Sequence, residues 1–119
     1  MGTTLVIGAS PNPDRYSHKA VVSLRAKGHE VIAFGPRKGH ILDIEITQEW
    51  NTNWEIDTVT LYINATVQRD YYEKITALNP RRVIFNPGTE NSEFYEILKK
   101  KGIEVEVACT LVLLSIGNY

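Results

Sequence analysis

VIGASPNPDRYSHKA, residues 6–20, says more about the fold than any other part of the sequence. An apolar run ends at Gly8, a polar loop with two prolines follows, and a helix is predicted to begin at Ser17. In an open α/β fold, such a loop holds a phosphate-bearing ligand, because the first N–H groups of the helix and its positive dipole end face the loop. Only one glycine stands at the turn, so the dinucleotide pattern G-x-G-x-x-G is absent. The loop therefore indicates a nucleotide-like ligand other than NAD.

Strand-like and helix-like segments alternate along the rest of the chain. The predicted strands cover residues 4–7, 30–34, 57–63, 82–85 and 104–108, and the predicted helices cover 17–27, 67–78 and 93–101. Residues 39–54 suggest a short strand or extended segment and then a helical turn within residues 47–54, and residues 110–119 suggest a short covering helix. The alternation predicts one domain, residues 1–119, with an α/β Rossmann-like fold: a three-layer sandwich with a central parallel sheet of about five strands.

Composition limits the classes of protein to which the chain can belong. The 119 residues carry a formal net charge of -1, which gives no general attraction to nucleic acid or to an anionic membrane. Cys109 is the single cysteine, so neither an internal disulfide nor a multi-cysteine metal site is expected. The chain runs directly into a strand and has no apolar run long enough to cross a bilayer. A cytoplasmic location is the expectation.

The first loop offers groups suited to phosphate. Ser10, Asn12 and Ser17 supply hydroxyl and amide donors, and Arg15 supplies a guanidinium fork. The loop is also long for a plain connection, in which Ser17 would simply cap the helix. The residues of this stretch predicted to contact a ligand are Gly8, Ala9, Ser10, Asn12, Arg15, Tyr16 and Ser17.

The second loop, Phe34-Gly35-Pro36-Arg37-Lys38-Gly39, carries two cations where a NAD-binding fold has an acidic residue for the ribose. A cation pair there suits an extra phosphate on the ribose, at the 2′ or the 3′ position. Because of this cation pair, Pro36, Arg37 and Lys38 are candidate ligand residues. The plainer explanation of the same residues is a solvated basic turn.

A third loop, Asn86-Pro87-Gly88-Thr89-Glu90-Asn91, ends another buried strand. Gly88 would let the backbone approach a ligand, and Asn91 or Ser92 could cap the next helix. Asn86, Pro87 and Gly88 complete the predicted binding residues.

The sequence contains no evident catalytic constellation. His18, His29 and His40 are scattered without a second ligand at metal-binding spacing, so no metal site is predicted. His18 lies near the first loop and could touch a ligand. Cys109 follows the last predicted strand, where an isolated cysteine is more often a buried small apolar residue than a reactive one.

Two segments resemble a known family. The run from Val6 to Ser17, together with Val31 to Gly39, resembles the small stand-alone CoA-binding domain proteins, and Asn86 to Cys109 is similar to their second half. The resemblance implies a Rossmann-like fold shared with the CoA-binding domain of the succinyl-CoA synthetase α subunit. It also implies that the first loop holds the phosphates of CoA.

The same resemblance implies that Lys38, in Pro36-Arg37-Lys38-Gly39, matches a lysine that approaches a CoA phosphate, and that the turn at residues 86–88 lines the adenosine side. The chain has nothing like the synthetase's phosphorylated histidine segment, so that reaction is not expected. The residues after Cys109 also lack the basic side chains of many relatives.

The resulting prediction is a protein that binds coenzyme A or an acyl-CoA without evident catalysis. An alternative is an NADP- or other nucleotide-dependent enzyme, for which Tyr16 and His18 are the only nearby proton donors. A further alternative is a ligand-sensing subunit of a larger complex. Trp50 and Trp54 either cover an edge of the core or form a contact in a homo-oligomer.

Overall fold

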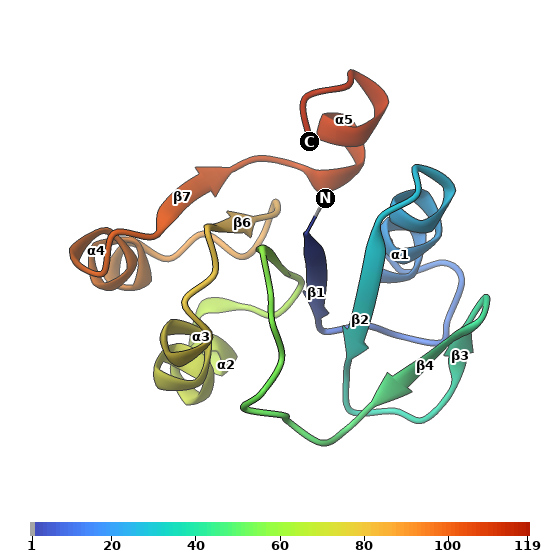
Figure 1. Ribbon diagram of the computed structural model, residues 1–119, viewed down its shortest axis with the longest axis horizontal. Coiled ribbons are helices and arrows are strands. Elements are labelled where there is room, and N and C mark those ends of the chain that lie inside the picture. Colours follow the sequence, from blue (N-terminus) through green and yellow to red (C-terminus); the bar gives the residue numbers. More distant parts are fainter. Residues whose placement is uncertain (1) are drawn as a thin grey trace.

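The computed structural model describes residues 2–119 as one sheet with helices on both faces (Figure 1). The strands are β1 (Thr3–Ile7), β2 (Glu30–Phe34), β3 (His40–Ile41), β4 (Ile44–Thr47), β5 (Thr58–Leu61), β6 (Arg82–Phe85) and β7 (Glu104–Val107). The helices are α1 (Tyr16–Ala26), α2 (Ala65–Gln68), α3 (Tyr72–Leu78), α4 (Ser92–Lys100) and α5 (Thr110–Ser115), with a 3₁₀ turn, η1 (Arg69–Tyr71), between α2 and α3. The Rossmann-like α/β architecture predicted from the sequence is confirmed.

The sheet within residues 2–119 has seven strands in the order β3-β4-β2-β1-β5-β6-β7, where about five were predicted. The two extra strands form an antiparallel hairpin at one edge, and the six strands from β4 to β7 run parallel. The number of strands predicted from the sequence was too low because β4 is short: it pairs with β2 only through Ala33–Ile46 and Phe34–Thr47. Such a short edge strand alternates apolar and polar residues and lacks the continuous apolar run of a central parallel strand.

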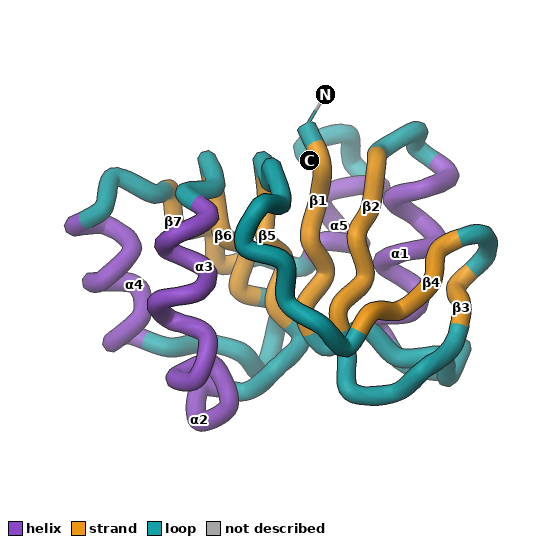
Figure 2. Tube along the Cα trace, turned by 60° about the horizontal axis from the view of Figure 1, so that its bottom comes forward, coloured by secondary structure: helices purple, strands orange, loops and turns teal. Residues whose placement is uncertain are grey.

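Each face of the sheet carries its own core. α1 and α5 cover one face, and α2, α3 and α4 cover the other (Figure 2). The α1/α5 face buries Val6, Val21, Leu24 and Leu114, among others. The opposite face buries a larger set that includes Leu5, Phe85, Phe94 and Leu98. Successive residues of one strand, such as Leu5 and Val6, thus point to opposite faces and pack into opposite cores, as the pleat requires.

The segment between β4 and β5 is a connection without a helix, and the helical turn predicted within residues 47–54 is reduced to one hydrogen-bonded turn. Its only helix-like feature is an isolated turn, in which the Trp54 N–H donates to the Asn51 carbonyl oxygen at 3.3 Å. Trp50 and Trp54 instead pack edge-on against Phe34, with ring centroids 5.2 and 6.3 Å away. These aromatic contacts hold the segment across the open edge of the core, and the interpretation of the tryptophans as a core cover is confirmed.

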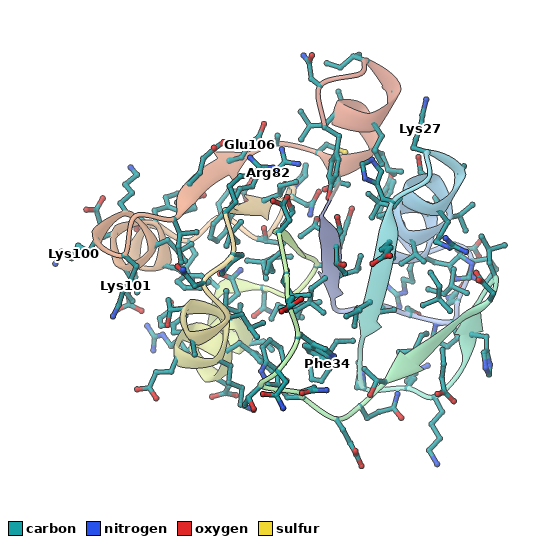
Figure 3. All side chains as sticks on the ribbon, in the orientation of Figure 1. Lys27, Phe34, Arg82, Lys100, Lys101 and Glu106 are labelled. Carbon is teal, nitrogen blue, oxygen red and sulfur yellow. The ribbon has the colours of Figure 1, made fainter. Side chains whose placement is uncertain are left out.

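At the other edge, a partly buried ion pair links β6 to β7. The Arg82 guanidinium donates to Glu106 at 2.8 Å and lies 4.4 Å from the centre of the Tyr119 ring. Figure 3 labels Arg82 and Glu106 side by side above β6, far from Phe34 at the carboxyl end of β2. Within residues 2–119, no helix is both long enough and apolar enough to span a membrane.

Candidate functional site

The strand order reverses at β1, and this places three loops at one edge of the sheet. β1 pairs with β2 on one side and with β5 on the other, and β6 lies beside β5. All four strands are parallel, so the loops after β1, β2 and β6 leave from the same edge. In open α/β sheets, ligands bind outside the carboxyl ends of the strands at such a reversal.

Gly8 closes the turn after β1, at a position where a residue larger than glycine does not fit. Its φ is +94°, and a Cβ there would lie 2.8 Å from the Tyr62 carbonyl oxygen. The N–H groups of Gly8 and Ala9 both donate to the Phe34 carbonyl oxygen, at 2.9 and 3.0 Å. The backbone N–H groups of these two predicted ligand residues are therefore bonded to the neighbouring strand and are not free to bind an anion.

The remainder of the first loop is shaped by its own polar side chains. The Asn12 N–H donates to Ser10 Oγ at 3.1 Å, and the Asp14 N–H donates to Asn12 Oδ1 at 2.9 Å. The His18 ring bonds to the Ser10 carbonyl oxygen at 3.0 Å. Ser10, Asn12 and His18 thus position the loop, which leaves the helix that follows it as the main source of N–H groups.

Helix α1 begins at Tyr16, after Arg15, and no side chain caps it. Its first N–H groups are therefore open to an anion, and the dipole of an eleven-residue helix favours one there. Arg15 and Tyr16 are exposed beside them. Because the helix begins one residue before Ser17, Ser17 is not its cap. Ser17 is buried in the first turn, and its side chain faces inward.

The loop after β2 passes so close to the first loop that only glycine fits at Gly35. A Cβ at Gly35 would lie 2.1 Å from the Ala9 carbonyl oxygen. The next residues, Pro36, Arg37 and Lys38, are exposed. Neither cation forms an ion pair with another described residue. Two positive charges without an ion-pair partner therefore stand beside the turn after β1, with Glu45 and Glu49 lining the same hollow as Lys38.

Asn86, which follows β6, is tied into the protein. It is 2% exposed, and its amide donates to Thr60 Oγ1 at 2.6 Å and to the Leu61 carbonyl oxygen at 2.9 Å. Its Oδ1 accepts from the Thr110 N–H at 2.8 Å, at the start of α5. Every hydrogen-bonding group of this side chain is thus satisfied internally, which indicates that Asn86 positions α5 against the sheet.

The rest of the third loop is held by a buried glutamine that the sequence analysis missed. Gln68 is fully buried and donates to the carbonyl oxygens of Ile63 and Thr89 at 2.9 and 2.8 Å. The Asn91 amide donates to Gln68 Oε1, while Asn91 Oδ1 caps α4, as predicted for this residue. Gln68 lies within a polar-looking helix, so periodicity alone gave no signal of its role.

Two cavities open at this edge, one on each face of the sheet. The first, here the Phe34 cavity, has a volume of about 250 Å³ and is lined by Gly8, Phe34, Pro36, Tyr71 and their neighbours. The second, here the Leu111 cavity, has a volume of about 300 Å³ and is lined by Tyr16, Tyr62, Asn86, Pro87, Cys109 and Leu111. The first loop joins them, because Gly8 lies at the Phe34 cavity and Tyr16 at the Leu111 cavity.

The loops therefore bring the predicted residues to one edge but divide them between two cavities. Gly8 and Pro36 line the Phe34 cavity, and Tyr16, Asn86 and Pro87 line the Leu111 cavity. Lys38 lines an open hollow on the other side of Pro36. Among the residues that the structure describes, no three His, Cys, Asp or Glu side chains gather as a metal site.

Tyr62 and Cys109 are site residues that the sequence analysis did not select. Burial raises the pKa of Tyr62 to about 12, although the nearby hydroxyls of Thr110 and Thr60 oppose part of the rise. The Tyr62 hydroxyl itself is buried without a hydrogen-bond partner in the described chain. Cys109 is partly exposed, so it is not the fully buried residue that was expected. Tyr62 directly follows β5, and its place at a strand end was the only signal available.

The family of the chain follows from a match that spans almost its whole length. The family described as CoA binding domain matches residues 2–115. The chain belongs to this family. The resemblance noted in the sequence is thereby confirmed, and CoA becomes the ligand against which the loops and cavities are to be tested.

Solved structures share the fold of this chain. An uncharacterized protein is 48% identical and superposes with a TM-score of 0.96, covering 100% of this chain and 98% of its own. The cell-free ID.343 protein from Thermus thermophilus is 25% identical, with a TM-score of 0.86 and coverage of 98% and 90%. A hypothetical protein from Pyrococcus horikoshii OT3, 22% identical with a TM-score of 0.81 and coverage of 92% and 78%, shares the fold. Among curated proteins, no relative matches the chain.

Proposed function

We propose that this protein binds coenzyme A or an acyl-CoA across the edge of the sheet where the strand order reverses. The observation that carries the proposal is that an uncapped helix N-terminus and two cations without an ion-pair partner lie at the same edge of the sheet, in a chain of the CoA-binding domain family. The diphosphate of the ligand would lie over the first turn of α1, where N–H groups and the exposed Arg15 side chain are available.

The position of the cations assigns a direction to the ligand. Pro36 lines the Phe34 cavity, and Arg37 and Lys38 follow it directly. A ribose 3′-phosphate beside these cations puts the adenosine at the Phe34 cavity, where the Phe34 and Tyr71 rings offer apolar surface. The other end of the ligand then passes Tyr16 toward the Leu111 cavity, so Asn86 and Pro87 would lie at the thiol end and not on the adenosine side that the resemblance implies. A ligand with a long arm would thus occupy both faces of the sheet edge.

The test compares CoA with 3′-dephospho-CoA by isothermal titration calorimetry on the wild-type protein and on Lys38→Ala. Removal of the 3′-phosphate is expected to weaken wild-type binding about tenfold, because one charge-assisted contact is lost. Lys38→Ala should weaken CoA by a similar factor and should bind the two ligands almost equally. Lys100→Ala, at the far end of α4 (Figure 3), is the matched control and should keep the wild-type preference.

Equal affinities of the wild-type protein for CoA and 3′-dephospho-CoA would contradict the role given to the cations. A thermal-shift comparison of CoA with NADPH and ATP addresses the nucleotide-dependent alternative. Stabilisation by NADPH at concentrations where CoA has no effect would replace the proposal with that alternative.

A further inference from the structure

The Leu111 cavity differs in chemistry from the rest of the site. Its six lining residues carry no formal charge, and they come from α1, α5 and the loops after β5, β6 and β7. Two of its polar side chains are not available to a ligand. The Asn86 amide forms all its hydrogen bonds within the protein, and the Tyr62 hydroxyl is buried below the cavity surface. A ligand therefore meets the Tyr16 and Tyr62 rings, Pro87, Leu111 and the Cys109 thiol, a lining that suits an apolar group.

We infer that the Leu111 cavity receives the acyl group of an acyl-CoA, and that it selects a short uncharged chain over free CoA and over a chain ending in a carboxylate. This inference rests on the proposed function, which directs the thiol end of the ligand past Tyr16 into this cavity. An acyl chain with a terminal carboxylate would be desolvated there without a cation in the lining, and this is unfavourable.

The size of the cavity limits the length of the chain. A volume of about 300 Å³ accommodates roughly ten non-hydrogen atoms at about 30 Å³ each, the share that a water molecule takes in the liquid. The sulfur end of CoA with a four-carbon acyl group is close to this limit. A butyryl group fits, and it buries methylene groups that free CoA lacks.

Two acyl-CoAs of equal chain length test the inference: butyryl-CoA and succinyl-CoA, each with four acyl carbons. Calorimetry on the wild-type protein should give about tenfold tighter binding of butyryl-CoA than of CoA, since each buried methylene contributes favourably. Succinyl-CoA should bind no more tightly than CoA. Equal affinities for butyryl-CoA and succinyl-CoA, or no advantage of butyryl-CoA over CoA, would overturn the inference.

A pair of variants in α5 locates the effect. Leu111→Trp fills the cavity and should remove the advantage of butyryl-CoA, so that butyryl-CoA and CoA bind this variant with equal affinity. Val112→Trp places the same ring on the next residue, which is 53% exposed and outside the cavity lining, and it should keep the advantage. Retention of the advantage in Leu111→Trp would refute the assignment. Absence of any CoA binding to the wild-type protein would instead refute the proposed function.

Discussion

Replacing Asn86 with alanine separates a structural role from a ligand-binding role at this position. The side chain donates to Thr60 Oγ1 and the Leu61 carbonyl oxygen, and it accepts from the Thr110 N–H. Asn86 is 2% exposed, so water cannot readily replace these partners. Alanine would leave the Thr110 N–H and the Leu61 carbonyl oxygen without this partner in a small cavity. It would also release the start of α5 from the sheet.

The expected loss of stability is about 3 kcal/mol, since each buried group left without a hydrogen-bond partner costs about 1–3 kcal/mol. For a chain of this size, the melting temperature should fall by roughly 12 °C, at about 4 °C for each kcal/mol. Urea unfolding followed by circular dichroism, with the slope m fitted freely, measures the change. Asn12→Ala is the control, because Asn12 is exposed and its side chain accepts only from the Asp14 N–H, at 2.9 Å. It should cost less than about 1 kcal/mol.

Stability within about 0.5 kcal/mol of wild type in Asn86→Ala would refute this reasoning. Unchanged stability with a large loss of CoA affinity would restore the ligand contact expected from the sequence. Thr110→Val should be milder than Asn86→Ala, because it removes the Thr60–Thr110 hydroxyl bond of 2.8 Å but keeps the Thr110 N–H paired to Asn86.

Three further predictions concern other parts of the site and the sheet. Gly35→Ala should destabilise the protein by more than 2 kcal/mol in urea unfolding, because its Cβ would lie 2.1 Å from the Ala9 carbonyl oxygen and the two loops must separate. Cys109 should react with iodoacetamide, and saturating CoA should slow the reaction at least fivefold by mass spectrometry; an unchanged rate would place the ligand elsewhere. Hydrogen bonds from Arg81 lower the pKa of Asp57, so this carboxylate adds stability above its unfolded pKa of about 3.9 and the gain is lost as the pH falls through the lowered folded pKa. Asp57→Asn should flatten the acid side of the stability profile below about pH 5, by less than about 1 kcal/mol since the pair is partly exposed.

The sequence predicted the central strands and the loops that follow them because these features have local causes. Apolar β-branched runs bounded by glycine or proline mark buried parallel strands, and β2 and β6 were placed at their observed bounds. The edge hairpin was predicted only as one short strand or extended segment, since two- and four-residue strands depend on pairing that only the folded sheet supplies. Of the helical turn predicted within residues 47–54, only the turn from Asn51 to Trp54 is present, and Trp50 of this segment packs on Phe34.

Asn86 shows where such prediction ends. An asparagine directly after a buried strand looks like a ligand contact, because loops at this edge usually carry the binding groups. Its partners, Thr60 and Thr110, are 26 and 24 residues away in the sequence. No local pattern reveals that α5 folds back to receive the side chain. The same holds for Cys109, whose place in a cavity depends on Tyr16 from the far end of the chain.

The structure also changes the physical basis for the choice of ligand. In the sequence, the shortage of glycines in the first loop argued against NAD. In the folded chain, the N–H groups of Gly8 and Ala9 both donate to the Phe34 carbonyl oxygen, so these two groups are not available to a phosphate. Recognition would then depend on the open N-terminus of α1 and on the charges of Arg37 and Lys38, which lie in different loops. A mononucleotide could use one of these groups and one cavity. A ligand with phosphates at two places and an apolar arm could use both cavities, and coenzyme A has these features.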